Sequence, residues 1–350
     1  MTGAEAGAGA PAVRGKVLIL VAAVVVLSLV AGAAVLHAGH RAAVKDRTQA
    51  GGPPVAAGPV TLGPAAAGRV VFRNMAYGPH RDELSSVPAA TPGGKRTASG
   101  MRCLRFYAAG GTGICLQAVH GPLSDSYRAV VLDSALRERA RYPLPGIPTR
   151  ARVSPSGHLL AWTVFVGGDS YAGSDFSTRT GILDTRTGAL DASLESYRAV
   201  RDGQPVHASD INYWGVTFAD DRHFYATMGT GGRTYLVRGD IAARTVTTVR
   251  TNVECPSLSP DGTRIAFKKR VPGLPADAPW RLYVLDLRTG RERALAEPRS
   301  VDDQVVWPDD HTVVYAMPSD YGSDLYTLPA DGTGAPRRLM TAALAPAYLR

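Results

Sequence analysis

Three short polar segments of the 350-residue chain carry the side chains best suited to bind a ligand. Each is expected next to the start of a β-strand. The candidate ligand-binding residues are Arg150, Arg152, Asp210, Asn212, Trp214, Asp302, Asp303 and Gln304. Guanidinium, amide and carboxylate groups together suit a ligand of mixed charge, although polar groups of this kind also line water-filled channels.

The carboxylates offer one catalytic alternative. Glycoside hydrolases use two carboxyl groups, less than about 10 Å apart, as acid, base or nucleophile. Asp210 with Asp302 or Asp303 would form such a pair, which makes a carbohydrate-active enzyme a possible function. Asp169 and Asp175 lie in a long insertion, residues 166–176, that is suited to a binding face, but their spacing matches no calcium loop.

Other catalytic and cofactor motifs are not found in the sequence. The eight histidines are not spaced as zinc ligands, and there is no G-x-S-x-G nucleophile elbow. A phosphate-binding loop and a dinucleotide fingerprint are also missing. We therefore expect no catalytic residue, no metal and no cofactor, and no hydrolase domain after the last repeat.

A repeated β-hairpin unit must position the candidate residues. Residues 254–267 are typical of strand, turn and strand, because Pro260 ends the first strand's ladder and Asp261-Gly262 supplies the turn. A second hairpin follows over residues 280–295. Four short antiparallel strands in about 40–45 residues is the period of a β-propeller blade.

Six such units begin near residues 69, 101, 150, 207, 252 and 302. A lone four-stranded sheet cannot bury both faces, so the units must pack around a channel. The sequence therefore predicts an all-β, six-bladed β-propeller of four-stranded antiparallel blades, with the three polar segments at one channel mouth. The first unit lacks an opening strand, and we expect the tail, residues 345–350, to supply it and close the ring.

Two motifs carry a family resemblance. Residues 259–267 (SPDGTRIAF) resemble the WD-like blade signature of TolB-like six-bladed propellers, and residues 283–290 fit the same family. The resemblance covers roughly residues 69–350 and implies a binding or scaffolding propeller of the bacterial envelope. The small α/β domain that precedes the propeller in TolB is not visible here, which argues against a role in the Tol system.

The segments ahead of the propeller predict a membrane anchor. Residues 1–16 form a cytoplasmic leader, residues 17–36 an uncharged apolar segment, and residues 37–68 an Ala/Gly/Pro-rich linker. At about 1.5 Å per residue, the apolar segment spans the ~30 Å bilayer core. We expect a single-pass signal anchor with the propeller on the extracytoplasmic side; secretion after cleavage near Ala33 is the alternative.

Cysteine usage and charge agree with an exported domain. Cys103 and Cys115 are expected on facing strands, within reach of a disulfide, and Cys255 as a buried small residue. The net charge of +9 is spread along strands and turns. It suits a solvated surface or attraction to anionic lipids or acidic wall polymers. No pattern for nucleic-acid binding is present.

These observations lead to one main functional expectation and two alternatives. The main one is a non-enzymatic, extracytoplasmic propeller that binds or scaffolds an envelope protein or peptide. The alternatives are a sensor that binds acidic cell-wall polymers and the carbohydrate-active enzyme described above. Contact with the membrane is expected through residues 17–36.

Overall fold

The computed structural model describes residues 10–48, 51–121, 124–166 and 177–350. Asp169 and Asp175 therefore lie outside the described residues. The chain divides into two compact units, Met1–Gln49 with Tyr77–Pro79, and Ala50–Ala76 with His80–Arg350.

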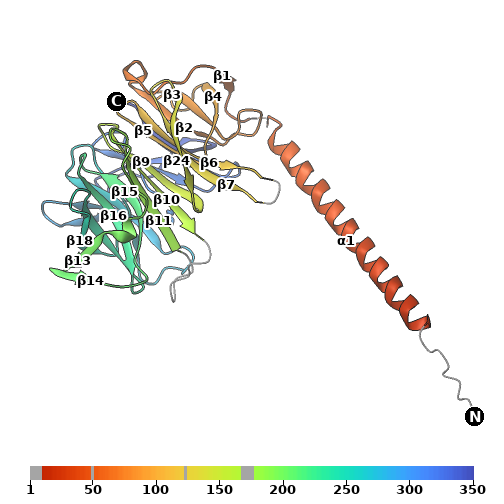
Figure 1. The fold of residues 1–350 in the computed structure, drawn as a ribbon. Coiled ribbons are helices and arrows are strands. Elements are labelled where there is room, and N and C mark those ends of the chain that lie inside the picture. Colours follow the sequence, from red (N-terminus) through yellow and green to blue (C-terminus); the bar gives the residue numbers. More distant parts are fainter. Residues whose placement is uncertain (1–9, 49–50, 122–123, 167–176) are drawn as a thin grey trace, which may run out of the picture. The chain divides into compact units, whose positions relative to one another are not determined.

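The first unit consists mainly of one long helix, α1 (Ala10–Lys45) (Figure 1). Its part Gly15–Arg41 is long and apolar enough to cross a membrane. Large apolar side chains are exposed along it, from Leu18 (70% exposed) to Leu36 (76% exposed). A helix that is apolar on all sides is typical of a membrane span.

The second unit is a six-bladed β-propeller of mostly four-stranded antiparallel sheets, which confirms the predicted fold (Figure 1). Blades two and three follow the chain directly. Blade two contains β5 (Arg105–Ala109), β6 (Thr112–Val119), β7 (Ser126–Leu132) and β8 (Glu138–Leu144). Blade three contains β9 (Ile147–Val153), β10 (Leu159–Val166), β11 (Ser177–Asp184) and β12 (Leu190–Asp191).

Blades four to six vary the same plan. Blade four contains β15 (Asn212–Phe218), β16 (His223–Thr230), β17 (Arg233–Asp240) and β18 (Thr245–Thr251), and is widened by the hairpin β13 (Arg198–Arg201) and β14 (Gln204–Val206). Blade five contains β19 (Glu254–Leu258), β20 (Arg264–Arg270), β21 (Trp280–Asp286) and β22 (Glu292–Ala294). Blade six contains β23 (Thr312–Met317), β24 (Asp324–Pro329) and β25 (Arg337–Met340), and a single bridge from Val306 to Val314 replaces its innermost strand.

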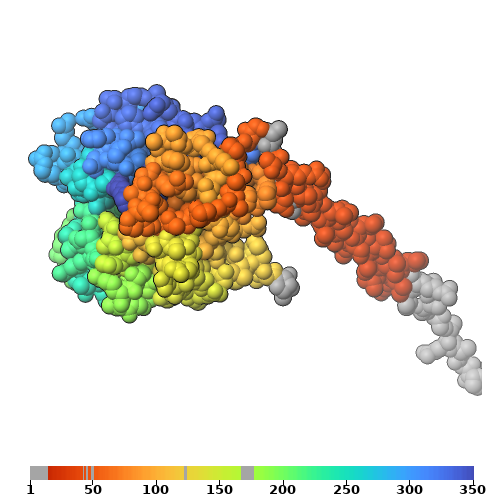
Figure 2. Space-filling model, turned by 90° about the horizontal axis from the view of Figure 1, so that it is seen from above, coloured from red at the N-terminus to blue at the C-terminus, as the bar shows by residue number. Residues whose placement is uncertain are grey.

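Blade one combines both ends of the propeller sequence. It contains β26 (Ala343–Tyr348), β2 (Arg69–Asn74), β3 (Glu83–Pro88) and β4 (Arg96–Arg102), with β1 (Val55–Ala57) added in parallel to β4. Strand β26 pairs antiparallel with β2, Val70 facing Tyr348. In Figure 2 the colours run around the propeller until the blue C-terminal blade meets the orange first blade. Two short 3₁₀ helices, η1 (Pro64–Ala66) and η2 (Leu194–Ser196), lie in connections.

The core consists of apolar layers between neighbouring blades. One layer joins Ile114 and Leu116 of blade two to Leu160 and Trp162 of blade three. Another joins blades five and six. Each sheet thus buries one face against the blade before it and one against the blade after it, as packing around a channel requires.

The turn of the SPDGTRIAF motif has a structural role. Gly262 adopts a φ of 70°, which favours glycine. The Asp261 carboxylate accepts hydrogen bonds from Ser259 Oγ and the Thr263 N–H, while Asp310 Oδ1 of blade six accepts the Asp261 N–H at 2.9 Å. The motif therefore shapes a turn and ties blade five to blade six.

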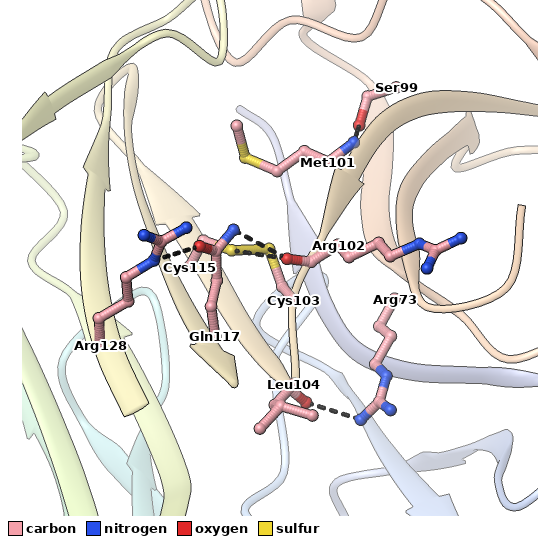
Figure 3. Close-up of a disulfide and its surroundings, with 9 residues drawn as sticks. All are labelled: Arg73, Ser99, Met101, Arg102, Cys103, Leu104, Cys115, Gln117 and Arg128. Carbon is pink, nitrogen blue, oxygen red and sulfur yellow. Dashed lines mark hydrogen bonds between the residues drawn. A yellow bond between two sulfur atoms is a disulfide. The ribbon is translucent and has the colours of Figure 1, made fainter. Parts of the chain in front are cut away.

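A disulfide joins Cys103 to Cys115, as predicted, with their Cα atoms 5.4 Å apart (Figure 3). The two residues are not directly opposite, because Cys115 faces Phe106 in the strand register and Cys103 precedes β5. The bridge thus fixes the connection between blades one and two to β6. Arg73 Nη1 holds the same connection by donating to the Leu104 carbonyl at 2.9 Å (Figure 3).

Candidate functional site

The innermost strands around the channel are interrupted by bulges. Their pairing shifts register in blades one, three, four and five. Gly215, Cys255 and Ala345 adopt φ values of 67°, 49° and 51° at these irregular places. For Cys255 and Ala345 this left-handed backbone is unusual, so the surrounding structure must hold it in place.

A small cavity at the start of several innermost strands brings four of the predicted residues together. We call it the arginine pocket. Its volume is about 30 Å³, and its lining residues are Arg105, Phe106, Thr149, Arg150, Ala151, Arg152, Asp303, Gln304, Val306, Ala345 and Pro346. This lining contains three guanidinium groups and one carboxylate, so the pocket has an excess of positive charge.

The single carboxylate of the pocket neutralises the arginines incompletely. Asp303 Oδ1 lies 3.9 Å from Nη1 of both Arg105 and Arg150, which is longer than a hydrogen bond. Arg150 Nη1 donates to the Thr149 carbonyl at 2.9 Å. Within the described part of the chain, Arg150 Nε is buried without a hydrogen-bond partner.

Burial lowers the pKa of Arg105 and of Arg152; Asp303 acts in the opposite direction on both, and the neighbouring Arg150 guanidinium lowers them further. Burial also opposes the charge of Arg150, but Cys255, Asp303 and Asp302 together outweigh it and raise the pKa of Arg150. The Arg105 side chain keeps 25% of its surface exposed, so water or a ligand can reach it. An anion bound here would restore the balance of charge.

Gln304 crosses the channel next to the arginines. Its Nε2 donates to the carbonyls of Gly215 and Pro256 at 3.1 and 2.6 Å, and to that of Val216 at 3.2 Å. These carbonyls belong to the bulged strands β15 and β19. The Gln304 side chain thus holds two innermost strands together.

A larger cavity continues the channel beyond Arg152, and we call it the aromatic chamber. Its volume is about 260 Å³, and the innermost segments of all six blades contribute to it. Tyr107, Phe218, Trp307 and Tyr348 contribute aromatic rings to its wall, which also contains polar residues such as Thr217, Ser257 and Ser259. Arg152 and Val306 line both cavities, so the two are adjoining parts of one channel.

Arg152 connects the two parts physically. Its Nη2 donates to the Val305 carbonyl at 2.7 Å, and its guanidinium carbon lies 4.6 Å from the centre of the Tyr107 ring. This side chain is therefore fixed between a charged pocket and an aromatic one.

The structure places the other predicted residues outside the arginine pocket. Asp302 has a side chain that is 66% exposed and bonds Lys268. Asn212 is buried, and its Oδ1 accepts the Thr178 N–H at 2.8 Å. The Trp214 ring packs beside Gly229 in the neighbouring strand.

Asp210 lies in a separate cleft of blade four. Its carboxylate accepts from Thr230 Oγ1 and the Gly231 N–H, both at 2.6 Å. The cleft is lined by Arg201, His207 and Arg233 and not by Asp302 or Asp303. The carboxylate pair proposed for a carbohydrate-active enzyme is therefore not brought into one cavity.

Sequence reasoning missed Arg105 and the aromatic chamber. Arg105 lies at the start of β5, the innermost strand of blade two, and Arg150 lies near the start of β9, the innermost strand of blade three. Alignment of these two strands could have identified Arg105. Cys255 is buried, and its sulfur lies 3.7 Å from Arg150 Nη2.

One cluster outside the channel contains the residue types of a serine hydrolase. His158 Nδ1 lies 2.9 Å from Asp221 Oδ2. Ser156, however, bonds the same Asp221 carboxylate. In a catalytic triad the serine bonds the far nitrogen of the imidazole, so this cluster connects blades three and four instead. In the described ranges, no group of three or more His, Cys, Asp or Glu could hold a metal ion.

No family model and no curated protein matches the chain. A puromycin-hydrolysing peptidase of Mycobacterium tuberculosis matches 80% of this chain and 44% of its own, with 16% identity and a TM-score of 0.46. Tricorn protease matches 79% of this chain and 30% of its own, with 10% identity and a TM-score of 0.49.

A third match is the propeller domain of the Trilobed protease from Pyrococcus furiosus, over 68% of this chain and 70% of that one, with 15% identity and a TM-score of 0.40. The chain thus spans less than half the length of the first two proteins. These comparisons agree with a six-bladed propeller and do not confirm membership of the TolB-like family.

The expectation of a non-enzymatic binding or scaffolding protein is contradicted by these comparisons. The matched propellers include those of peptidases, so the exclusion of enzymatic activity is withdrawn. Identities of this order show a shared fold alone. The activities in those proteins' names are therefore not assigned to this chain.

Proposed function

We propose that the propeller is the substrate-binding part of an enzyme whose substrate carries a carboxylate, and that the arginine pocket binds this carboxylate. The observation that supports the proposal is the excess of three guanidinium groups over one carboxylate in a largely buried pocket. Buried charges of one sign are normally paired. A carboxylate from a ligand would pair with the guanidinium groups that Asp303 does not reach within hydrogen-bonding distance.

The size and donors of the arginine pocket fit this ligand. A cavity needs about 10–15 Å³ for each water-sized group, so a volume of about 30 Å³ holds two, the number of oxygens in a carboxylate. Guanidinium groups bind carboxylates through forked N–H donors. The rest of the substrate would occupy the adjoining aromatic chamber.

We assign binding and not bond cleavage to the channel. Neither cavity is lined by a histidine or a cysteine among the residues described. The reacting groups would come from an adjoining polypeptide, and the propeller would select and orient the substrate.

We further propose that α1 anchors the propeller at the extracytoplasmic side of a membrane. The disulfide supports this location, because disulfides persist in oxidising compartments. Protease added to intact cells should then remove the propeller; protection of the propeller until the cells are lysed would contradict this orientation.

Calorimetric titration of the full chain in detergent micelles tests the carboxylate site. The probes are 3-phenylpropionate and its neutral amide, which share an aromatic group and differ in charge. We expect the acid to bind at least tenfold more tightly and Arg105→Met to remove this preference. Arg141→Met, on the outer strand of blade two, is the control because it removes an equal charge far along the sheet from the pocket strand. Equal binding of acid and amide would overturn the proposal.

The enzymatic part has its own test. Membranes from cells that express the chain are incubated with synthetic peptides, and loss of intact peptide is followed by mass spectrometry. We expect faster loss than with membranes that lack the chain, and at least a tenfold decrease in this difference with Arg105→Met. No difference between membranes with and without the chain would contradict an enzymatic role.

A further inference from the structure

We propose that the substrate is the C-terminus of a peptide with an apolar last residue, whose carboxylate binds the arginine pocket while its amide N–H donates to Gln304 Oε1. This inference rests on the carboxylate site proposed above and adds the chemical class of the substrate. It starts from a second unsatisfied group in the same pocket, the side-chain oxygen of Gln304.

The hydrogen bonds of Gln304 fix the orientation of its amide. Its Nε2 faces three backbone carbonyls, those of Gly215, Val216 and Pro256. Exchange of the nitrogen and oxygen would bring Oε1 against three acceptors, which cannot donate to it. Oε1 is therefore the acceptor that Gln304, a lining residue of the arginine pocket, has left for a ligand.

This oxygen is a buried acceptor that lacks a donor. Gln304 is 6% exposed, and its Oε1 has no hydrogen-bond partner within the described part of the chain. Buried polar atoms nearly always have a partner, so an unpaired one in a pocket indicates a group that the ligand supplies. The ligand must then carry an N–H or O–H donor as well as a carboxylate.

The charge of the pocket selects among such ligands. A free amino acid carries an ammonium group beside its carboxylate, and the excess of guanidinium groups would repel it. An acylated nitrogen is neutral and keeps one N–H, two bonds from the carboxylate carbon. This is the arrangement at the C-terminus of a peptide.

The adjoining chamber selects the side chain. Tyr107, Val306 and Trp307 lie next to the arginine pocket and present apolar and aromatic surface. Arg152 and Arg350 line the chamber and would repel a basic last residue.

Three probes separate the two proposals when titrated into the full chain in detergent. N-acetyl-phenylalanine has the carboxylate and the N–H. O-acetyl-phenyllactate has an ester oxygen in place of the N–H, and N-acetyl-phenylalanine amide lacks the carboxylate. We expect the ester to bind at least tenfold more weakly than N-acetyl-phenylalanine, since a buried hydrogen bond to Gln304 is lost, and the amide to bind more weakly still.

The outcomes are distinct. If the ester binds as well as N-acetyl-phenylalanine while the amide does not, the peptide class is overturned and the carboxylate site stands. If the amide binds as well as the acid, the carboxylate site fails. Gln304→Met should remove the preference for N–H over ester and keep that for acid over amide; a Gln304→Met protein that retains the N–H preference would overturn the assignment of Gln304. The three probes on the unmodified chain decide the question even if that variant does not fold.

Discussion

Replacement of Arg96 by methionine should weaken the closure of the propeller ring. Arg96 lies on β4, is 2% exposed, and is held against the chain that leads into β26. Its Nη1 donates to Asn74 Oδ1 at 2.6 Å and to the Ala342 carbonyl at 2.8 Å, and its Nη2 donates to the Thr341 carbonyl. Methionine fills a similar volume and supplies none of these donors.

The expected loss follows from two opposing effects. Hydrogen bonds from a charged donor contribute about 1.5–3 kcal/mol each, so three give about 4–9 kcal/mol. Against this, burial lowers the pKa of Arg96 from its ordinary value to about 10, with Asp324 acting in the opposite direction. A shift of that size corresponds to about 3 kcal/mol of unfavourable burial, which the substitution removes. The net decrease in the free energy of unfolding is therefore about 1–6 kcal/mol.

Urea unfolding followed by circular dichroism measures this loss, and hydrogen exchange locates it. Amide protons of β26 and β2 should exchange faster in Arg96→Met than those of blades three and four. The matched control is Arg69→Met on β2, where the guanidinium Nε donates to Ser86 Oγ at 2.7 Å and remains partly exposed. The control should cost less than about 1 kcal/mol. If both variants unfold at the same urea concentration, the argument that Arg96 secures the closure is refuted.

Three further predictions concern the stability of the propeller. Burial, with a smaller effect of Asp309, raises the pKa of the Tyr348 hydroxyl to about 12, whereas in the unfolded chain this hydroxyl loses its proton near pH 10.0. The free energy of unfolding should therefore be constant below pH 10 and decrease from there up to about pH 12. The decrease should be less steep in Tyr348→Phe, as urea midpoints at pH 8–11 will show. Reduction of the disulfide, which spans a sequence separation of 12 residues, should lower the free energy of unfolding by about 3 kcal/mol, measured with and without reductant; an unchanged midpoint would refute this. Gly239→Ala should lower the melting temperature, because the added Cβ would lie 2.1 Å from a Phe224 ring carbon, and a variant as stable as the parent would show that the two strands can separate.

The blades could be predicted from the sequence because their signals are local. One turn is shaped by Pro260, Asp261 and Gly262 through contacts within a few residues, and the same pattern of strand, turn and strand repeats along the chain. The disulfide was predictable for the same reason, although its position was not, because Cys103 lies before β5 and not within it.

The site could be predicted only in part because it depends on distant contacts. Arg105, Arg150 and Asp303 come from three blades, and their convergence is set by the packing of whole sheets. Asp210 precedes β15 and Asn212 begins it, as expected of residues at the channel mouth. Their oxygens nevertheless accept the N–H groups of Gly231, which follows β16 in the same blade, and of Thr178 in β11 of blade three. This competition between local partners and the channel cannot be read from spacing.

The bulges of the innermost strands connect the fold to the proposed binding site. Cys255 occupies left-handed backbone, which costs a non-glycine residue about 1–2 kcal/mol. This conformation interrupts the pairing of β19 beside Pro256, whose carbonyl then accepts from Gln304 Nε2 rather than from a neighbouring strand. The strained backbone therefore fixes the Gln304 amide before any ligand arrives. An acceptor held in one orientation loses little conformational entropy on binding, so strain that weakens the sheet can strengthen the discrimination between an amide and an ester.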